Sequence, residues 1–209
     1  MELFLMILGA LTSVMNPLGT VPVFVGLTKE HTVKGRNRIA FWTSLNVLII
    51  LLISFFGGKF ILLFFGITLN SLKIAGGLVI TLSGFALLTG EYVKHKGMKK
   101  EKVKNDIKER SDISLTPLAL PMIAGPGTIS LLITFNQEYQ ESNNVLIIIE
   151  AILLSTIIIY IVLRSSFLIV KMLGASGING LSRIIGFIVI AIGVEFIVSA
   201  IKSAFNVLS

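Results

Sequence analysis

The chain has no cysteine, only two histidines and few charged residues. Without cysteine it can form neither disulfides nor thiolate metal sites. The two histidines, His31 and His95, lie in charged loops rather than in the apolar segments. We therefore expect no metal site and no cofactor. Charged residues make up 14% of the 209 residues, against about a quarter in a soluble domain, which argues against a soluble fold.

Long apolar runs fill most of the sequence. The hydrophobic fraction is 54% and the mean hydropathy is +0.92. Several runs approach or exceed the roughly 20 residues that a helix needs to cross a bilayer. We expect six spans, at about 3–25, 39–56, 72–90, 115–135, 145–163 and 184–201, and a further apolar stretch at 60–67 extends the second span or dips back into the membrane. The predicted fold class is an all-α integral membrane protein.

The basic residues are distributed unevenly over the predicted loops. The loops after the first, third and fifth spans contain 15 of the 18 lysines and arginines. Basic loops stay in the cytoplasm, so this distribution predicts a multi-pass protein of the plasma (inner) membrane with both termini outside. Because the charge serves to orient the protein in the lipid bilayer, its net value of +7 does not predict nucleic-acid binding.

The spans divide into two similar halves. We expect a three-helix repeat at 1–90, a basic cytoplasmic connector at 91–114 and a second three-helix repeat at 115–209. The third span of each half begins alike, with Lys73-Ile-Ala-Gly in the first half and Arg183-Ile-Ile-Gly in the second. An odd number of spans makes the second half enter the membrane from the opposite side, so the predicted repeats are inverted.

All five prolines fall in the first spans of the two halves. Pro17 and Pro22 lie in the first span, and Pro117, Pro121 and Pro126 lie in the fourth. A proline inside a helix removes a backbone hydrogen bond and displaces a carbonyl. In a membrane, freed polar groups are tolerated where protein or a water-filled cavity surrounds them. The pattern therefore predicts broken first and fourth helices, as transporters use to build a binding site.

Glycine and threonine accompany both breaks. Gly19-Thr20 and Gly127-Thr128 occupy matching places in the two halves, and Asn16 and Gly125 lie close to them. Freed N–H groups suit a carboxylate and freed carbonyls or hydroxyls suit an ammonium group, so the pair fits a small zwitterion. The candidate substrate-binding residues are Asn16, Gly19, Thr20, Gly125, Gly127 and Thr128. The alternative is that both breaks are structural kinks.

Two acidic residues fall inside predicted spans. Glu195 lies in the middle of the sixth span and Glu150 lies early in the fifth. A charge at the centre of a membrane helix is costly, so such residues usually face the interior of the bundle. Glu195 is a candidate for proton coupling or for a structural contact. Lys73 and Arg183, at span ends, are expected to reach opposite membrane surfaces.

Glycines in the third spans of the two halves predict a different role. Gly76, Gly77 and Gly84 lie in one of these spans, and Gly186 and Gly193 lie in the other. Small residues at such spacings allow helix backbones to approach closely. We expect them to serve helix packing rather than ligand contact.

The paired motifs resemble those of the MarC family of bacterial and archaeal inner-membrane proteins. They are the segments at 16–22, Asn-Pro-Leu-Gly-Thr-Val-Pro, and 121–128, Pro-Met-Ile-Ala-Gly-Pro-Gly-Thr, together with the Arg-Ile-Ile-Gly start of the last span. The resemblance covers essentially the whole chain. It implies a six-helix transporter with inverted repeats, and members include transporters of small neutral amino acids such as glycine and alanine. The family often has glutamine where this chain has Glu195, which argues against a family-wide proton role for that position.

The predicted function is secondary transport of small neutral amino acids by alternating access, with proton coupling as an open question. The alternatives are transport or export of another small polar solute or drug, an intramembrane enzyme, or a structural membrane protein. An enzyme would need a nucleophile and base, or a metal cluster, inside the membrane, and we expect no catalytic residues. The sequence leaves homo-oligomer formation open.

Overall fold

The computed structural model describes residues 2–89 and 113–206. Regular structure in these residues is entirely helical. The elements are α1 (Glu2–Met15), α2 (Pro17–Thr28), α3 (Val33–Phe65), α4 (Leu69–Thr89), η1 (Ser114–Ile123), α7 (Pro126–Glu138), α8 (Ser142–Arg164) and α9 (Ser166–Asn206). The predicted connector at 91–114 lies almost entirely outside the described residues.

Five stretches of the described chain are long and apolar enough to cross a membrane. They are Glu2–Thr28, Val33–Phe65, Leu69–Thr89, Ser142–Arg164 and Ser176–Phe205. The fourth predicted span, 115–135, is divided instead into η1, a π-helix, and the separate helix α7. The fourth predicted span is therefore not among the five stretches.

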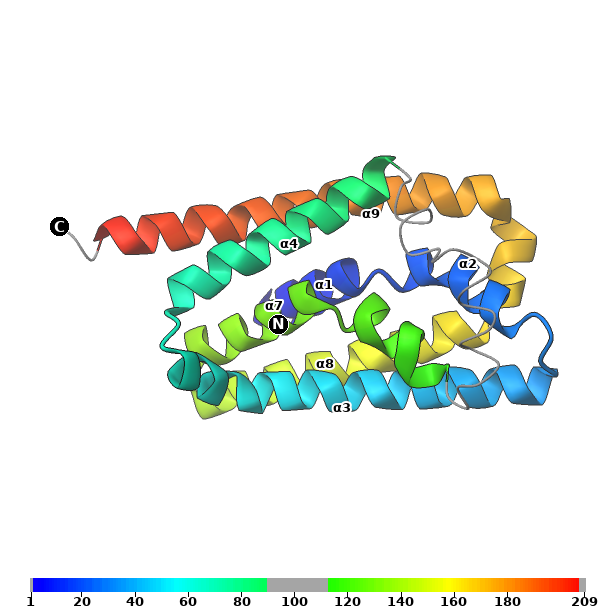
Figure 1. Cartoon of the computed structure of the whole chain (residues 1–209), viewed down its shortest axis with the longest axis horizontal. Helices are drawn as coiled ribbons and strands as arrows, with labels where there is room; N and C mark the ends of the chain where they lie inside the picture. The colour runs from blue at the N-terminus through cyan, green and yellow to red at the C-terminus, as the bar shows by residue number, and fades with distance from the viewer. Residues whose placement is uncertain (1, 90–112, 207–209) are drawn as a thin grey trace.

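The helices form three layers (Figure 1). The long helices α3 and α8 lie side by side along one edge of the molecule, and α4 and α9 lie along the opposite edge. The broken pairs α1–α2 and η1–α7 run between these two layers, in opposite directions. Helices α3 and α8 both contact the middle layer, as do α4 and α9. Both breaks are therefore enclosed between full-length helices.

The hydrophobic core lies between the broken helices and the α3–α8 layer. Ile7 and Leu11 of α1, Leu51 of α3 and Ile152 of α8 are all fully buried there. The apolar side chains that remain exposed belong to outward faces, for example Ile53 on α3 and Phe187 on α9. In lipid, burial of apolar surface gives little driving force between helices, so close packing has to hold these layers together.

Glycines bring α4 and α9 into backbone contact, as the sequence predicted. A Cβ atom on Gly77 would lie 2.6 Å from the carbonyl oxygen of Gly193, and one on Gly84 would lie 2.7 Å from that of Gly186. Larger residues would force the helices apart at both points. Gly76 packs elsewhere, because its Cβ would overlap the side chain of Ser130 in α7.

Two expectations about charged residues in the spans are wrong. The Lys73 side chain does not extend into solvent; it is only 7% exposed and pairs with Glu138 at the end of α7. Because Lys73 lies beside α7, its ammonium group binds a carboxylate of the protein instead of water. Glu195 does not face the interior of the bundle, because the fold turns its side of α9 outward, where the residue is exposed. Glu150, on α8, is exposed as well.

Candidate functional site

The first break is centred on Asn16. Its backbone N–H donates to the carbonyl of Thr12 at the end of α1, and it then adopts a left-handed conformation, with φ 45° and ψ 66°. Asparagine is one of the few non-glycine residues that tolerate this region. Pro17 follows as the first residue of α2, where its missing N–H costs nothing. The residue order Asn-Pro thus ends one helix and starts the next.

The Asn16 side chain caps α2 and leaves one end unpaired. Its Oδ1 accepts a hydrogen bond from the N–H of Gly19 at 3.2 Å, which fixes Nδ2 as the other end of the amide. Nδ2 has no hydrogen-bond partner among the described residues, although Asn16 is only 1% exposed. An unpaired buried donor costs about 1–3 kcal/mol. Such a donor is suited to an acceptor on a ligand.

Gly19 and Thr20 support this arrangement. A Cβ on Gly19 would lie 2.1 Å from Nδ2 of Asn16, so glycine is required where the amide folds back over the helix start. The hydroxyl of Thr20 donates to the carbonyl of Asn16 at 3.3 Å. Its proton is thereby directed at the backbone, which leaves its oxygen able to accept. Pro22 lies within α2, half-buried.

The second break has similar parts but a different cap. The N–H of Ala124 donates to the carbonyl of Ala119 at 2.9 Å, the wide spacing of a π-helix, and π-helical turns recur at functional sites. Gly125 is the N-cap of α7, is extended and has no side chain to cap the helix. Pro126 is the first residue of α7. The start of α7 therefore lacks the side-chain cap that Asn16 gives α2.

Thr128 repeats the role of Thr20 at the second break. Its hydroxyl donates to the carbonyl of Ile123 at 3.2 Å, and the residue is buried. It thus satisfies a carbonyl that η1 leaves free at its end. Pro121 lies within the backbone of η1, and Pro117 lies earlier in the same helix.

The structure brings the two breaks together. A Cβ on Gly127 would lie 3.7 Å from the side chain of Val14, two residues before Asn16, and 2.9 Å from that of Ile80 in α4. Helix α1 contacts α7, and α2 contacts η1. The breaks also lie near each other at the centre of the molecule in Figure 1. The six candidate residues thus belong to two adjacent breaks, from which the exposed Glu195 is separate.

A comparison with protein families identifies the chain. Residues 1–205 match the model of the MarC family, described as "MarC family integral membrane protein". The chain belongs to the MarC family.

Relatives of this MarC-family chain occur in bacteria and archaea. It is 36% identical to the UPF0056 membrane protein YhcE of Escherichia coli (strain K12), over 93% of this chain and 90% of the relative. It is also 36% identical to the UPF0056 membrane protein MJ1677 of Methanocaldococcus jannaschii, over 98% of both chains. It is 34% identical to the UPF0056 inner membrane protein MarC of Escherichia coli (strain SMS-3-5), over 89% of this chain and 88% of the relative. No solved structure matches the chain significantly.

Two polar contacts between helices involve none of the six candidate residues. Asn46 of α3 donates from Nδ2 to the hydroxyl of Ser114 in η1 at 3.2 Å, which joins two neighbouring helices. Lys73 and Glu138 form an ion pair between α4 and α7. The usable signal for this pair was the place of Lys73, one turn before Gly76, where a helix packs too closely for an unpaired cation.

Proposed function

We propose that this MarC-family protein is a secondary transporter of small neutral amino acids of the glycine and alanine type. The observation that carries the proposal is the buried, unpaired Nδ2 of Asn16, held at one helix break beside a second one. A kink that served packing alone would gain nothing from leaving that donor without a partner.

The groups around the breaks match the two ends of an amino acid. The Nδ2 of Asn16 and the uncapped start of α7 offer donors and a positive helix end to a carboxylate. The hydroxyl oxygens of Thr20 and Thr128, whose protons are used on backbone carbonyls, offer acceptors to an ammonium group. The six candidate residues carry no charge that would require a charged substrate.

The proposal includes an inverted repeat. Within the described residues, the glycines with positive φ are Gly66, at 65°, and Gly174, at 63°. Their separation along the chain equals that between Gly19 and Gly127. Both follow the second apolar helix of their half. The two glycines share the sign of φ but not ψ, which is 27° at Gly66 and 175° at Gly174, so they support the repeat as matching breaks after the second span of each half.

The contact between α4 and α9 supports the same symmetry. A single shift along the chain takes Gly77 to Gly186 and Gly84 to Gly193. The observed contacts join Gly77 with Gly193 and Gly84 with Gly186, so each contact is converted into the other by the repeat. This reciprocity is what a two-fold axis in the membrane plane produces, and exchange of conformation between two such halves gives alternating access.

The test is uptake of labelled glycine or alanine into liposomes that contain the purified protein. The side of the membrane that carries the basic loops is taken as the cytoplasmic side. We expect saturable uptake that unlabelled amino acid competes away, and a dependence on a proton gradient would show coupling. Liposomes with heat-inactivated protein provide the control. No uptake of any small amino acid by protein that elutes as a single folded species would contradict the proposal and favour a structural or enzymatic role.

A further inference from the structure

A partly buried ion pair joins the two halves at one end of the molecule. The Nζ of Lys73, in α4, lies 2.5 Å from Oε1 of Glu138, the last residue of α7, and the two side chains are 8% and 34% exposed. Among the described residues no other ion pair occurs. Phe196 of α9 covers the ammonium group, with its ring centre 5.9 Å from Nζ. Helices α4, α7 and α9 therefore meet at this pair.

The contact between α4 and α7 continues from the ion pair inward. The hydroxyl of Ser130 donates to the carbonyl of Leu72 at 3.2 Å, and Gly76 leaves room for that same serine. Further along α7, Gly127 packs against Ile80. The α4–α7 seam, defined by these contacts from Gly127 to Glu138, thus covers the second break from the side on which α7 ends.

A lysine in this position is stable only while it is paired or reaches water. A charged side chain inside a membrane helix is costly, and removal of one partner leaves the other charge buried. Since Glu138 is one third exposed, separation of α4 from α7 would hydrate both groups at once. Separation of the pair would therefore leave neither charge buried without a partner.

We propose that the Lys73–Glu138 ion pair is a gate that closes the path from the side opposite the basic loops to the two helix breaks. This inference rests on the proposed transport function and names a moving part of it. The seam opens when α4 and α7 separate, and the ion pair forms again when they close.

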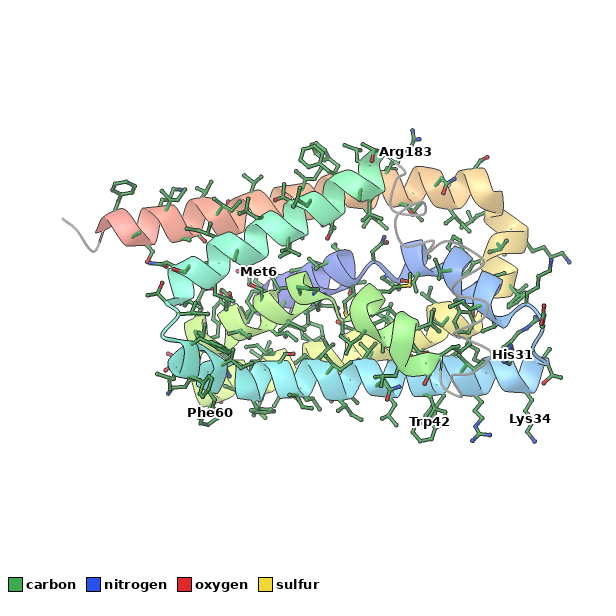
Figure 2. The ribbon with its side chains drawn as sticks, viewed as in Figure 1. Met6, His31, Lys34, Trp42, Phe60 and Arg183 are labelled. Atoms are coloured by element: carbon green, nitrogen blue, oxygen red, sulfur yellow. The ribbon has the colours of Figure 1, made fainter. Side chains whose placement is uncertain are left out.

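The repeat assigns a matching pair to the other end. Lys73 matches Arg183 through the starts Lys-Ile-Ala-Gly and Arg-Ile-Ile-Gly, one residue beyond the shift that relates the glycine contacts, and Glu138 matches Glu30 at the separation of Gly19 and Gly127. Helices α2 and α9 contact each other, as α4 and α7 do, so an equivalent seam exists. Both Glu30 and Arg183 are exposed, and Arg183 lies well away from His31, the neighbour of Glu30 (Figure 2). In the gate mechanism Glu30 and Arg183 approach when the Lys73–Glu138 pair opens.

The absence of cysteine makes the gate directly testable. Ser130 is 5% exposed and lies inside the seam, so a Ser130→Cys variant has one thiol that the closed gate protects. Its rate of labelling by a membrane-impermeant maleimide, added from the side opposite the basic loops, reports opening. The measurement needs no substrate, so its outcome is independent of whether amino acids are transported.

In this background we expect Glu138→Gln and Lys73→Met to raise the labelling rate about tenfold, because a minor open state of at most about 10% becomes the major one. Lys59→Met removes an exposed lysine outside the seam and should leave the rate unchanged. The exchange of Lys73→Glu with Glu138→Lys should restore protection, which would show that the labelling rate depends on the ion pair. Unchanged labelling in both single variants, in protein that elutes normally, would overturn the gate.

The reciprocal pair is tested in the same experiment. In the gate mechanism the Glu30–Arg183 pair forms when the Lys73–Glu138 pair is open. Arg183→Gln and Glu30→Gln remove the Glu30–Arg183 interaction and so disfavour the state in which Ser130→Cys is accessible. Each variant should therefore lower the labelling rate of Ser130→Cys. An unchanged or higher rate in both variants would overturn the role of the Glu30–Arg183 pair and leave the Lys73–Glu138 result to stand alone.

Discussion

Replacement of Gly84 by alanine should destabilise the protein through the contact between α4 and α9. The new Cβ would lie 2.7 Å from the carbonyl oxygen of Gly186 and 2.8 Å from the backbone N of Ile190, whereas ordinary contact begins at 3.4 Å. Two of the atoms met are backbone, so no side chain can move aside and the helices have to separate. Overpacking of this kind costs about 1–3 kcal/mol.

A matched control separates the cost of overpacking at Gly84 from the change in helix propensity. Gly180, in α9, has nothing within 4 Å of its Cβ position, so Gly180→Ala gains only helix propensity, about 0.5–1 kcal/mol. Because Gly84→Ala gains the same propensity, the difference between the two variants equals the overpacking cost of about 1–3 kcal/mol. The measurement is unfolding of both variants in detergent, followed by circular dichroism. Equal stability of the two variants would refute the reasoning that backbone contact holds α4 to α9.

Three further predictions concern individual side chains. Gly19→Ala would place a methyl group 2.1 Å from Nδ2 of Asn16 and displace the cap, so uptake should be lost in liposomes while membrane insertion, measured by fractionation, is retained. Glu195→Gln, at an exposed position of α9, should leave the proton dependence of uptake unchanged if coupling resides at the breaks, and loss of that dependence would assign coupling to Glu195. The pKa of Tyr139 lies above its ordinary value of 10.0, first because of burial and then because of the charge of Glu138. The protonated phenol therefore contributes stability that is fully present below pH 10 and lost as the pH rises through the higher pKa of the folded state. Absorbance titration should show the pKa of Tyr139 falling toward 10.0 in Glu138→Gln. An unchanged pKa would contradict the contribution of the Glu138 charge.

The sequence was sufficient to predict both helix breaks and the glycine contact. Proline and glycine act through the local backbone, so Pro17 and Gly125 indicate a helix boundary whatever surrounds them. The close approach at Gly84 follows from residue size and spacing in the same way. The sequence matched Gly76 to Gly186 at the starts of the two third spans. In the structure Gly77 and Gly84 make the contacts with α9, and Gly76 packs on Ser130.

The direction in which charged side chains point could not be predicted. Helix α9 is apolar on all sides, so nothing in its pattern tells which face turns inward, and Glu195 was expected inside although it is exposed. Lys73 was expected at a surface because snorkelling is the usual behaviour at a span end. Its actual partner, Glu138, lies 65 residues away in a helix whose position depends on the second break, and local reasoning could not connect them.

The proposed substrate site is tested most directly by equilibrium binding of labelled glycine to purified Asn16→Asp protein. Aspartate keeps the oxygen that caps Gly19 and tolerates the left-handed backbone, but it replaces the free Nδ2 donor by a carboxylate oxygen. Loss of one hydrogen bond to a charged group costs about 1.5–3 kcal/mol, so glycine should bind about 10- to 100-fold more weakly. Asn143→Asp, the same change at an exposed position in the first turn of α8, should bind glycine as the unaltered protein does. Equal affinity of the Asn16 and Asn143 variants, or no saturable binding by the unaltered protein, would contradict a site for small amino acids at the paired helix breaks.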